Sequence, residues 1–230
     1  MQEKRYTLTA DFEIQGRLAY LSHQETLTLF QRAFIRAGVP LAFSSGFNPR
    51  PRLSIPLPRS VGCQSSVERI CAGLDTDEPL DPSQAWAALQ SQLPDDCRII
   101  KMECLSGKAA YHAQTVRYAF ILDGPIDAAL QEKLTACQEA LASGGSIEIQ
   151  RYRAKKRRTE AFDISGFVKQ IEIDEDGVEV ACLVSQAGTV RIDELMQWMG
   201  LSMQMLKSPV RRTAVEWTAS GGSIPSEENI

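Results

Sequence analysis

Apolar and polar side chains alternate over residues 5–14. A period of two is typical of a β-strand with one buried face, so we predict a strand there. Beyond Gly16 the apolar period becomes helical, in a stripe made by Leu27, Phe30, Ala33, Phe34 and Ala37. Ser22 followed three residues later by Glu25 is a capping-box signature, and it predicts where this helix starts.

The rest of the first half continues with strands and one more helix. Gly38 and Pro40 end the first helix, and Asp81-Pro82 starts the second. We predict strands over 39–43, 67–74 and 98–105, and an extended segment over 53–57. The resulting order, β-α-β-β-α-β, is typical of the ferredoxin-like arrangement.

The second half repeats this rhythm less cleanly. Its predicted strands cover 115–122, 146–153, 170–173, 178–185 and 210–217. Its predicted helices cover 126–141 and 192–198, with a short helical turn over 162–169. Asp174-Glu175-Asp176-Gly177 is a hairpin signal.

We therefore expect an α+β fold of two ferredoxin-like units in tandem, with antiparallel sheets and helices on one face. The N-terminal domain would cover residues 1–106 and an elaborated C-terminal domain residues 107–219, with a linker over 106–114. The polar tail over 220–230 is expected to be disordered.

A stiff, positively charged loop over residues 43–53 is the most informative segment of the chain. Pro49 and Pro51 fix their own φ angles and favour extended geometry in the residues before them. The loop ends in Arg50 and Arg52, so it presents positive charge at low entropic cost. This favours a phosphate or carboxylate partner, although a solvated connection is the plain alternative.

The charge distribution adds a second basic segment. The net charge is −4, yet residues 151–158 hold six basic residues in eight. A local patch of this kind binds polyanions even on an acidic chain. The candidate nucleic-acid-binding residues are Arg151, Tyr152, Arg153, Lys155, Lys156, Arg157 and Arg158. RNA and an acidic protein surface are both compatible with this run.

The cysteines, the lengths of the apolar runs and the N-terminal pattern limit which classes of protein the sequence can belong to. The six cysteines are scattered and form no C-x-x-C pair, so we expect reduced, buried thiols and no metal site or cofactor. No apolar run approaches the roughly 20 residues that span a bilayer, so no membrane partner is expected. The N-terminus lacks a signal-peptide pattern, which makes the cytoplasm the expected location.

Several segments of the first half resemble the radical SAM-linked proteins, a domain of unknown function encoded beside or fused to a radical SAM enzyme. The match rests on Leu21-Ser22-His23, on residues 30–40 and on Ser45-Gly46-Phe47-Asn48-Pro49. Val61-Gly62 and residues 66–68 continue it. The second half fits loosely. The resemblance implies a radical SAM enzyme as partner.

The chain also departs from that family's pattern. Arg50 stands where a histidine is usual, and Cys71 stands where an acidic residue is usual. The three-cysteine motif that radical SAM chemistry requires is absent from the sequence. We therefore expect a non-catalytic accessory or substrate-presenting protein that binds an anionic partner, RNA being one candidate.

The expected ligand-binding residues are Arg36, Asn48, Arg50, Arg52 and Glu68, with Glu68 orienting an arginine. The alternative is a metal-independent endoribonuclease resembling the CRISPR repeat-processing enzymes, with His23 as general base. The glycine-rich loop expected near the C-terminus of those enzymes is missing here. Local packing or hydrogen bonding of His23 is the plain reading of that residue.

Overall fold

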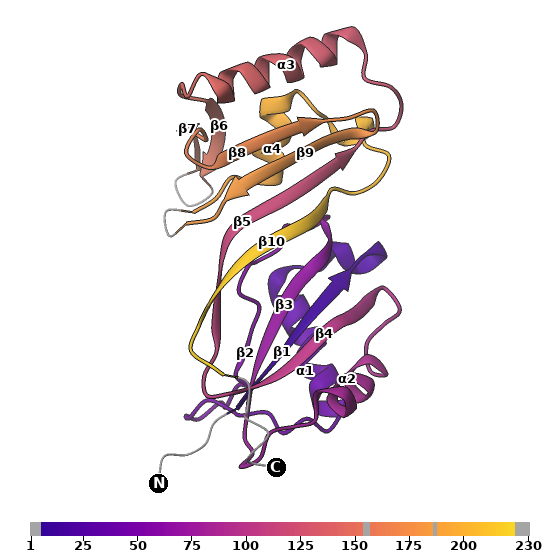
Figure 1. Ribbon diagram of the computed structural model, residues 1–230, viewed down its shortest axis with the longest axis vertical. Helices are drawn as coiled ribbons and strands as arrows, with labels where there is room; N and C mark the ends of the chain where they lie inside the picture. The colour runs from indigo at the N-terminus through magenta and orange to yellow at the C-terminus, as the bar shows by residue number, and fades with distance from the viewer. Residues whose placement is uncertain (1–5, 154–156, 186–187, 224–230) are drawn as a thin grey trace. The chain divides into compact units, whose positions relative to one another are not determined.

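The computed structural model describes residues 6–153, 157–185 and 188–223, which form two compact units. Unit 1 is Met1–Ala113 together with Trp217–Ile230, and unit 2 is Gln114–Glu216. The chain enters unit 2 within strand β5 (Ala110–Ile121) and leaves it within β10 (Arg211–Ser220). Figure 1 shows all the elements. The chain therefore passes between the units inside these two strands.

Unit 1 contains strands and helices in the order β-α-β-β-α-β. They are β1 (Tyr6–Ile14), the 3₁₀ helix η1 (Gly16–Tyr20), α1 (His23–Arg36), β2 (Leu53–Ser54), β3 (Gln64–Leu74), α2 (Pro82–Gln90) and β4 (Cys97–Ser106). Strand β1 lies between β4 and β3, and the short β2 pairs with the other side of β3. All these pairings are antiparallel.

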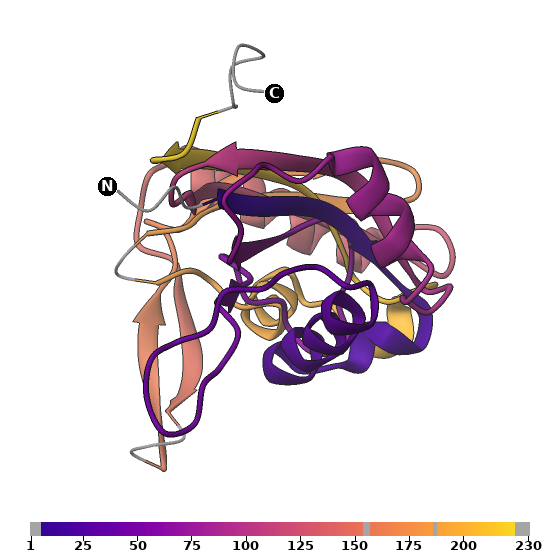
Figure 2. The ribbon, with the colours of Figure 1, turned by 90° about the horizontal axis from the view of Figure 1, so that it is seen from below.

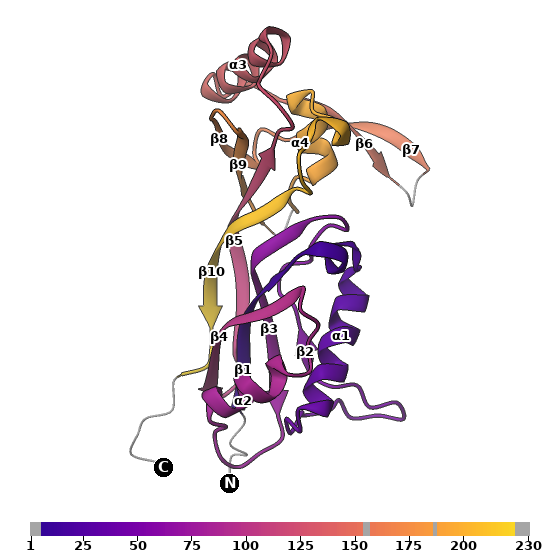
Figure 3. The same cartoon turned by 90° about the vertical axis from the view of Figure 1, so that its right-hand side faces the viewer.

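Apolar and polar residues alternate along β1, so the apolar ones lie on one face of this sheet and the polar ones on the other. Its even-numbered apolar residues pack with α1 and α2 in a single buried core. Phe12 contacts Phe30 of α1, with ring centroids 4.5 Å apart. The odd-numbered residues of β1, among them Thr7, Thr9 and Asp11, lie on the opposite face. On that face Asp11 forms a bidentate ion pair with Arg69 of β3, at 2.6 and 2.8 Å. Figure 3 shows α1 along one side of this sheet.

The helix starts in unit 1 follow the sequence closely. Ser22 and Glu25 form the predicted capping box, in which the Ser22 backbone N–H donates to Glu25 at 2.9 Å and the Glu25 N–H donates to the Ser22 hydroxyl at 3.3 Å. The Ser22 hydroxyl also donates to the Glu25 carboxylate at 2.6 Å, and this bond, followed by that from the Ser22 N–H, lowers the pKa of Glu25. Asp81 caps α2 by accepting from the Ser83 N–H at 2.8 Å. Both starts are confirmed.

Unit 2 has an additional hairpin in its centre. After β5 come α3 (Ala128–Ala142), β6 (Glu148–Arg153), β7 (Arg158–Asp163), β8 (Val168–Ile173), β9 (Gly177–Leu183), α4 (Ile192–Met199), the 3₁₀ helix η2 (Met203–Met205) and β10. The strand order is β10-β5-β9-β8, and β6 and β7 form a separate two-stranded sheet. The predicted turn at 174–177 joins β8 to β9, with the Asp174 carboxylate accepting from the Asp176 and Gly177 N–H groups.

The expectation of a mixed α+β protein with antiparallel strand pairing is confirmed, whereas three local predictions are wrong. Residues 39–43 form only isolated bridges, at Leu41 and Phe43. The expected helical turn over 162–169 is instead the end of β7, a turn and the start of β8. Much of the expected linker over 106–114 belongs to β5, because this strand begins at Ala110.

All six cysteines are buried thiols, as the sequence predicts. Among the described residues, no helix has both the length and the apolar character needed to cross a membrane.

Candidate functional site

Residues 43–52 form a closed projection that we call the finger. The Ser44 N–H donates to the Arg50 carbonyl at 2.8 Å, and the Arg50 N–H donates to the Ser44 hydroxyl at 3.0 Å. Phe43 and Pro51 form an antiparallel bridge next to them. Figure 2 shows the finger as a purple loop that extends away from α1. These contacts support the predicted stiffness, because they add a hydrogen-bonded stem to the two prolines.

Every residue from Ser45 to Arg50 is exposed, and Phe47 is exposed to 106% of the reference value. The ring of Phe47 is therefore wholly available to a partner, and aromatic side chains contribute strongly to the energetics of interfaces. Asn48 and Arg50 follow it on the same projection. Sequence reasoning singled out the arginines and missed Phe47, although a phenylalanine between Gly46 and Asn48 in a Pro-rich loop was a usable signal.

The base of the finger is fixed to the sheet of unit 1. The Ala42 N–H donates to the Gly73 carbonyl at 2.8 Å, and the Gly73 N–H donates to the Arg52 carbonyl at 2.9 Å. A Cβ atom at position 73 would lie 3.2 Å from the Arg52 Cβ, so the glycine permits this close approach. The finger is therefore anchored on β3.

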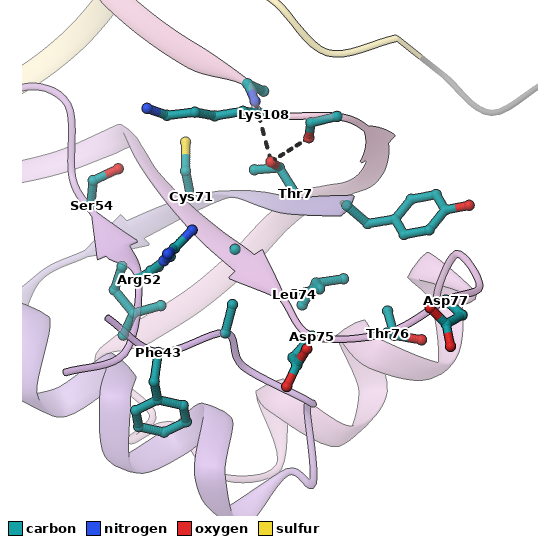
Figure 4. Close-up of a pocket in the computed structure, with 16 residues that line it drawn as sticks. Thr7, Phe43, Arg52, Ser54, Cys71, Leu74, Asp75, Thr76, Asp77 and Lys108 are labelled. Atoms are coloured by element: carbon teal, nitrogen blue, oxygen red, sulfur yellow. Dashed lines mark hydrogen bonds between the residues drawn. The ribbon is translucent and has the colours of Figure 1, made fainter. Parts of the chain in front are cut away.

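A cavity of about 720 Å³ lies at this base, within unit 1. Arg52 and Lys108 line it with positive charge, and Asp75 and Asp77 line it with negative charge. Figure 4 shows Arg52 near Ser54 and Cys71, with Asp75 and Asp77 on the other side. Of the predicted ligand-binding residues, Arg52 thus faces a cavity while Asn48 and Arg50 lie on the exposed finger.

Cys71, which also lines the cavity, is a neutral thiol at physiological pH. Burial raises its pKa to about 11, and the nearby Arg69 guanidinium offsets only part of this effect. Because the thiolate is the nucleophilic form of cysteine, the raised pKa makes Cys71 a poor nucleophile. The described residues contain no group of three or more His, Cys, Asp or Glu placed to hold a metal ion.

The remaining predicted residues of unit 1 do not gather at the finger. His23 and Arg36 are the first and last residues of α1, so about 20 Å of helix separates them. The finger follows the Arg36 end of the helix (Figure 3). Glu68 is 2% exposed in β3, and about 16 Å of strand separates it from Gly73 at the base of the finger. The structure therefore does not place His23 or Glu68 beside Arg50 and Arg52.

The basic run of unit 2 lies on the β6–β7 hairpin, and its first residue is buried. The Arg151 side chain forms a bidentate ion pair with Glu194 of α4, at 2.5 and 2.6 Å, and its guanidinium lies 3.3 Å from the centroid of the Phe162 ring. Arg153 and Arg158 are both within ion-pair distance of Glu160, at 3.7 and 2.6 Å.

Tyr152 is 56% exposed on this hairpin, and Arg157 and Arg158 are exposed as well. Lys155 and Lys156 lie outside the described residues. The run is thus only partly a free basic surface, because Arg151 is committed to the interior of unit 2.

These features define a class: an α+β protein with an aromatic- and arginine-bearing finger and a charged cavity at its base. The chain belongs to DUF2344, described as an uncharacterized protein conserved in bacteria, whose family model matches residues 7–194. No curated protein matches the sequence. The family's description mentions no radical SAM enzyme, so that association does not follow from membership.

Proposed function

We propose that this protein is a non-catalytic accessory protein that binds an anionic partner through the finger, and that the partner is single-stranded RNA. The observation that carries the proposal is the fully exposed Phe47, held on a hydrogen-bonded stem next to Asn48 and Arg50. Aromatic side chains stack on unpaired bases, and arginines contact phosphates. A preorganised finger lowers the entropic cost of both contacts.

The β6–β7 hairpin of unit 2 supports the same proposal independently. It presents an exposed aromatic residue, Tyr152, together with the exposed Arg157 and Arg158. The combination of aromatic and basic side chains thus occurs in both units. We place RNA contacts on these exposed hairpin residues and none on Arg151, because its guanidinium is buried as well as paired with Glu194, whereas Arg158 stays exposed beside Glu160.

The proposal has two further parts, the ferredoxin-like fold of each unit and the protein partner, and each rests on a separate observation. The strand orders β4-β1-β3-β2 in unit 1 and β10-β5-β9-β8 in unit 2 support two ferredoxin-like units, the second carrying the β6–β7 insertion. A radical SAM enzyme as the protein partner, to which the RNA would be presented, is supported only by the resemblance of residues 21–49 to the radical SAM-linked family.

The test is a fluorescence-anisotropy titration of a labelled single-stranded RNA with the full chain at several salt concentrations. We expect Phe47→Ala to weaken binding by about 1–3 kcal/mol through lost stacking. Arg50→Gln should lower the salt slope by about 0.7, as expected for the loss of one phosphate contact on a single strand.

Arg98→Gln is the matched control, because it removes one exposed arginine of unit 1 that pairs with Glu13 on β1. It should leave affinity nearly unchanged. Equal affinity of wild type, Phe47→Ala and Arg50→Gln would contradict the finger's role. Cleavage of the RNA in EDTA that is lost in His23→Ala would instead support the endoribonuclease alternative.

A further inference from the structure

The cavity at the base of the finger is lined by residues of β1, β2 and β3 in the sheet of unit 1. The pairing register places Thr7 opposite Gly73 and Thr9 opposite Cys71, while Ser54 of β2 lies opposite Cys71 on the other side. Arg52 is hydrogen-bonded to Gly73 in the same row. Because Gly73 has no side chain, Arg52 can pack over it: a Cβ atom at position 73 would lie 3.2 Å from the Arg52 Cβ.

Opposite charges line this cavity without neutralising one another. Across the part of the chain that the structure describes, Arg52, Lys108, Asp75 and Asp77 form no ion pair within 4.0 Å. The two cations lie toward Ser54 and Cys71, and the two carboxylates lie beyond the end of β3 (Figure 4). A pocket with separated charges of opposite sign is complementary to a molecule that carries both.

The backbone of the turn that carries Lys108 is held in place, and the exposed Lys108 side chain extends from it. The Thr7 hydroxyl donates to the Gly107 carbonyl at 2.8 Å and accepts from the Ala109 N–H at 3.2 Å (Figure 4). Thr7 is buried, so these bonds are shielded from water. They hold the backbone on both sides of Lys108 at the rim of the cavity.

From this arrangement we propose that the cavity binds a small zwitterionic molecule. Its oxyanion, a carboxylate or a phosphate, lies against Arg52 and Lys108, and its amine lies against Asp75 and Asp77. The neutral Cys71 and Ser54 line the wall near the cationic end. The volume of about 720 Å³ lies inside the range of about 300–1,000 Å³ typical of small-molecule sites. This site is separate from RNA binding at the tip of the finger.

The experiment measures binding of ω-amino acids of increasing chain length to the full protein by isothermal titration calorimetry. The series runs from 4-aminobutyrate through 6-aminohexanoate to 8-aminooctanoate, with 6-aminohexyl phosphate as the phosphate arm. Hexanoate and hexylamine, which each lack one charge, are the controls. We expect one chain length to bind at least about tenfold more tightly than either control.

Two variants outside the finger test which residues bind the oxyanion end of the ligand and which bind its amine end. Lys108→Gln should remove the advantage over hexylamine, and an Asp75→Asn/Asp77→Asn double variant should remove the advantage over hexanoate. Lys101→Gln, an exposed β4 lysine paired with Glu103, is the charge-matched control. Failure of every member of the series to bind saturably, or equal affinity for the zwitterions and hexanoate, would overturn the proposal. Neither result bears on RNA binding, which uses different residues and a different ligand.

Discussion

At the residue scale, burial decides which charged side chains are available for binding. The run at residues 151–158 looks uniformly basic in sequence, yet Arg151 pairs with Glu194, 43 residues away along the chain. No local pattern marks such a partner, because the pairing depends on how α4 packs against the β6–β7 hairpin. The exposed Phe47 is the opposite case. A phenylalanine is normally predicted to be buried, and only the closed stem of the finger explains why this one is not.

The Arg151–Glu194 pair gives a stability prediction at this scale. The two side chains are only 8% and 3% exposed, so Glu194→Gln would leave a buried guanidinium without its counter-charge. We expect a loss of about 3–5 kcal/mol in the free energy of unfolding, measured by urea denaturation. Arg98→Gln, which breaks an exposed pair, should cost at most about 1 kcal/mol.

A double variant separates the interaction from the loss of packing. Arg151→Met/Glu194→Met removes both charges together, so it should be less destabilised than the sum of the two single Met variants. Additive losses would show that the ion pair contributes little to the stability of unit 2.

At the scale of elements, the spacing of apolar residues predicts most strands and helices correctly. The prediction fails where the buried side chains are small, and where a turn is stabilised by a polar side chain. The sequence predicts a linker at the start of β5 because the buried residues there, Ala113 in the strand and Ala109 just before it, are small and give a weak apolar signal. Where the sequence predicts a helical turn after β7, the chain makes a tight turn into β8, and the Asp163 side chain stabilises that turn. Its carboxylate accepts hydrogen bonds from the Ser165 and Ile147 N–H groups. These bonds lower the pKa of Asp163 to about 2, and the bond from Ser165 has the largest effect.

The β8–β9 hairpin gives a prediction for an element. Gly177 has φ +159°, and a Cβ atom there would collide with the Phe120 carbonyl of the neighbouring β5. Gly177→Ala should therefore destabilise unit 2 by about 1–3 kcal/mol, measured by thermal or urea unfolding. Gly166→Ala is the control, because a Cβ atom at position 166 meets nothing within 4 Å and Gly166 has no positive φ. Equal stability of the two variants would contradict the close packing of β9 on β5.

At the scale of the whole molecule, the sequence predicts two similar halves joined over residues 106–114, a segment that contains the first crossing between the units. The crossings at residues 113–114 and 216–217 lie inside β5 and β10, whose alternating pattern continues across them. A composition shift or a Pro- and Gly-rich linker, which are the usual signals of a boundary, is therefore missing. For the candidate site, the sequence predicts Asn48, Arg50 and Arg52, whereas it does not predict Lys108 and the two aspartates, which come from distant segments that only folding brings to one cavity.

In the proposed complex the tip of the finger contacts the anionic partner, and ultraviolet cross-linking locates that contact directly. Full-length protein bound to a single-stranded RNA is irradiated with ultraviolet light, and the cross-linked residues are identified by mass spectrometry. We predict a cross-link at Phe47, because its wholly exposed ring is placed to stack on a base. Cross-links found only outside residues 43–52, with Phe47 unmodified in the bound complex, would contradict the account.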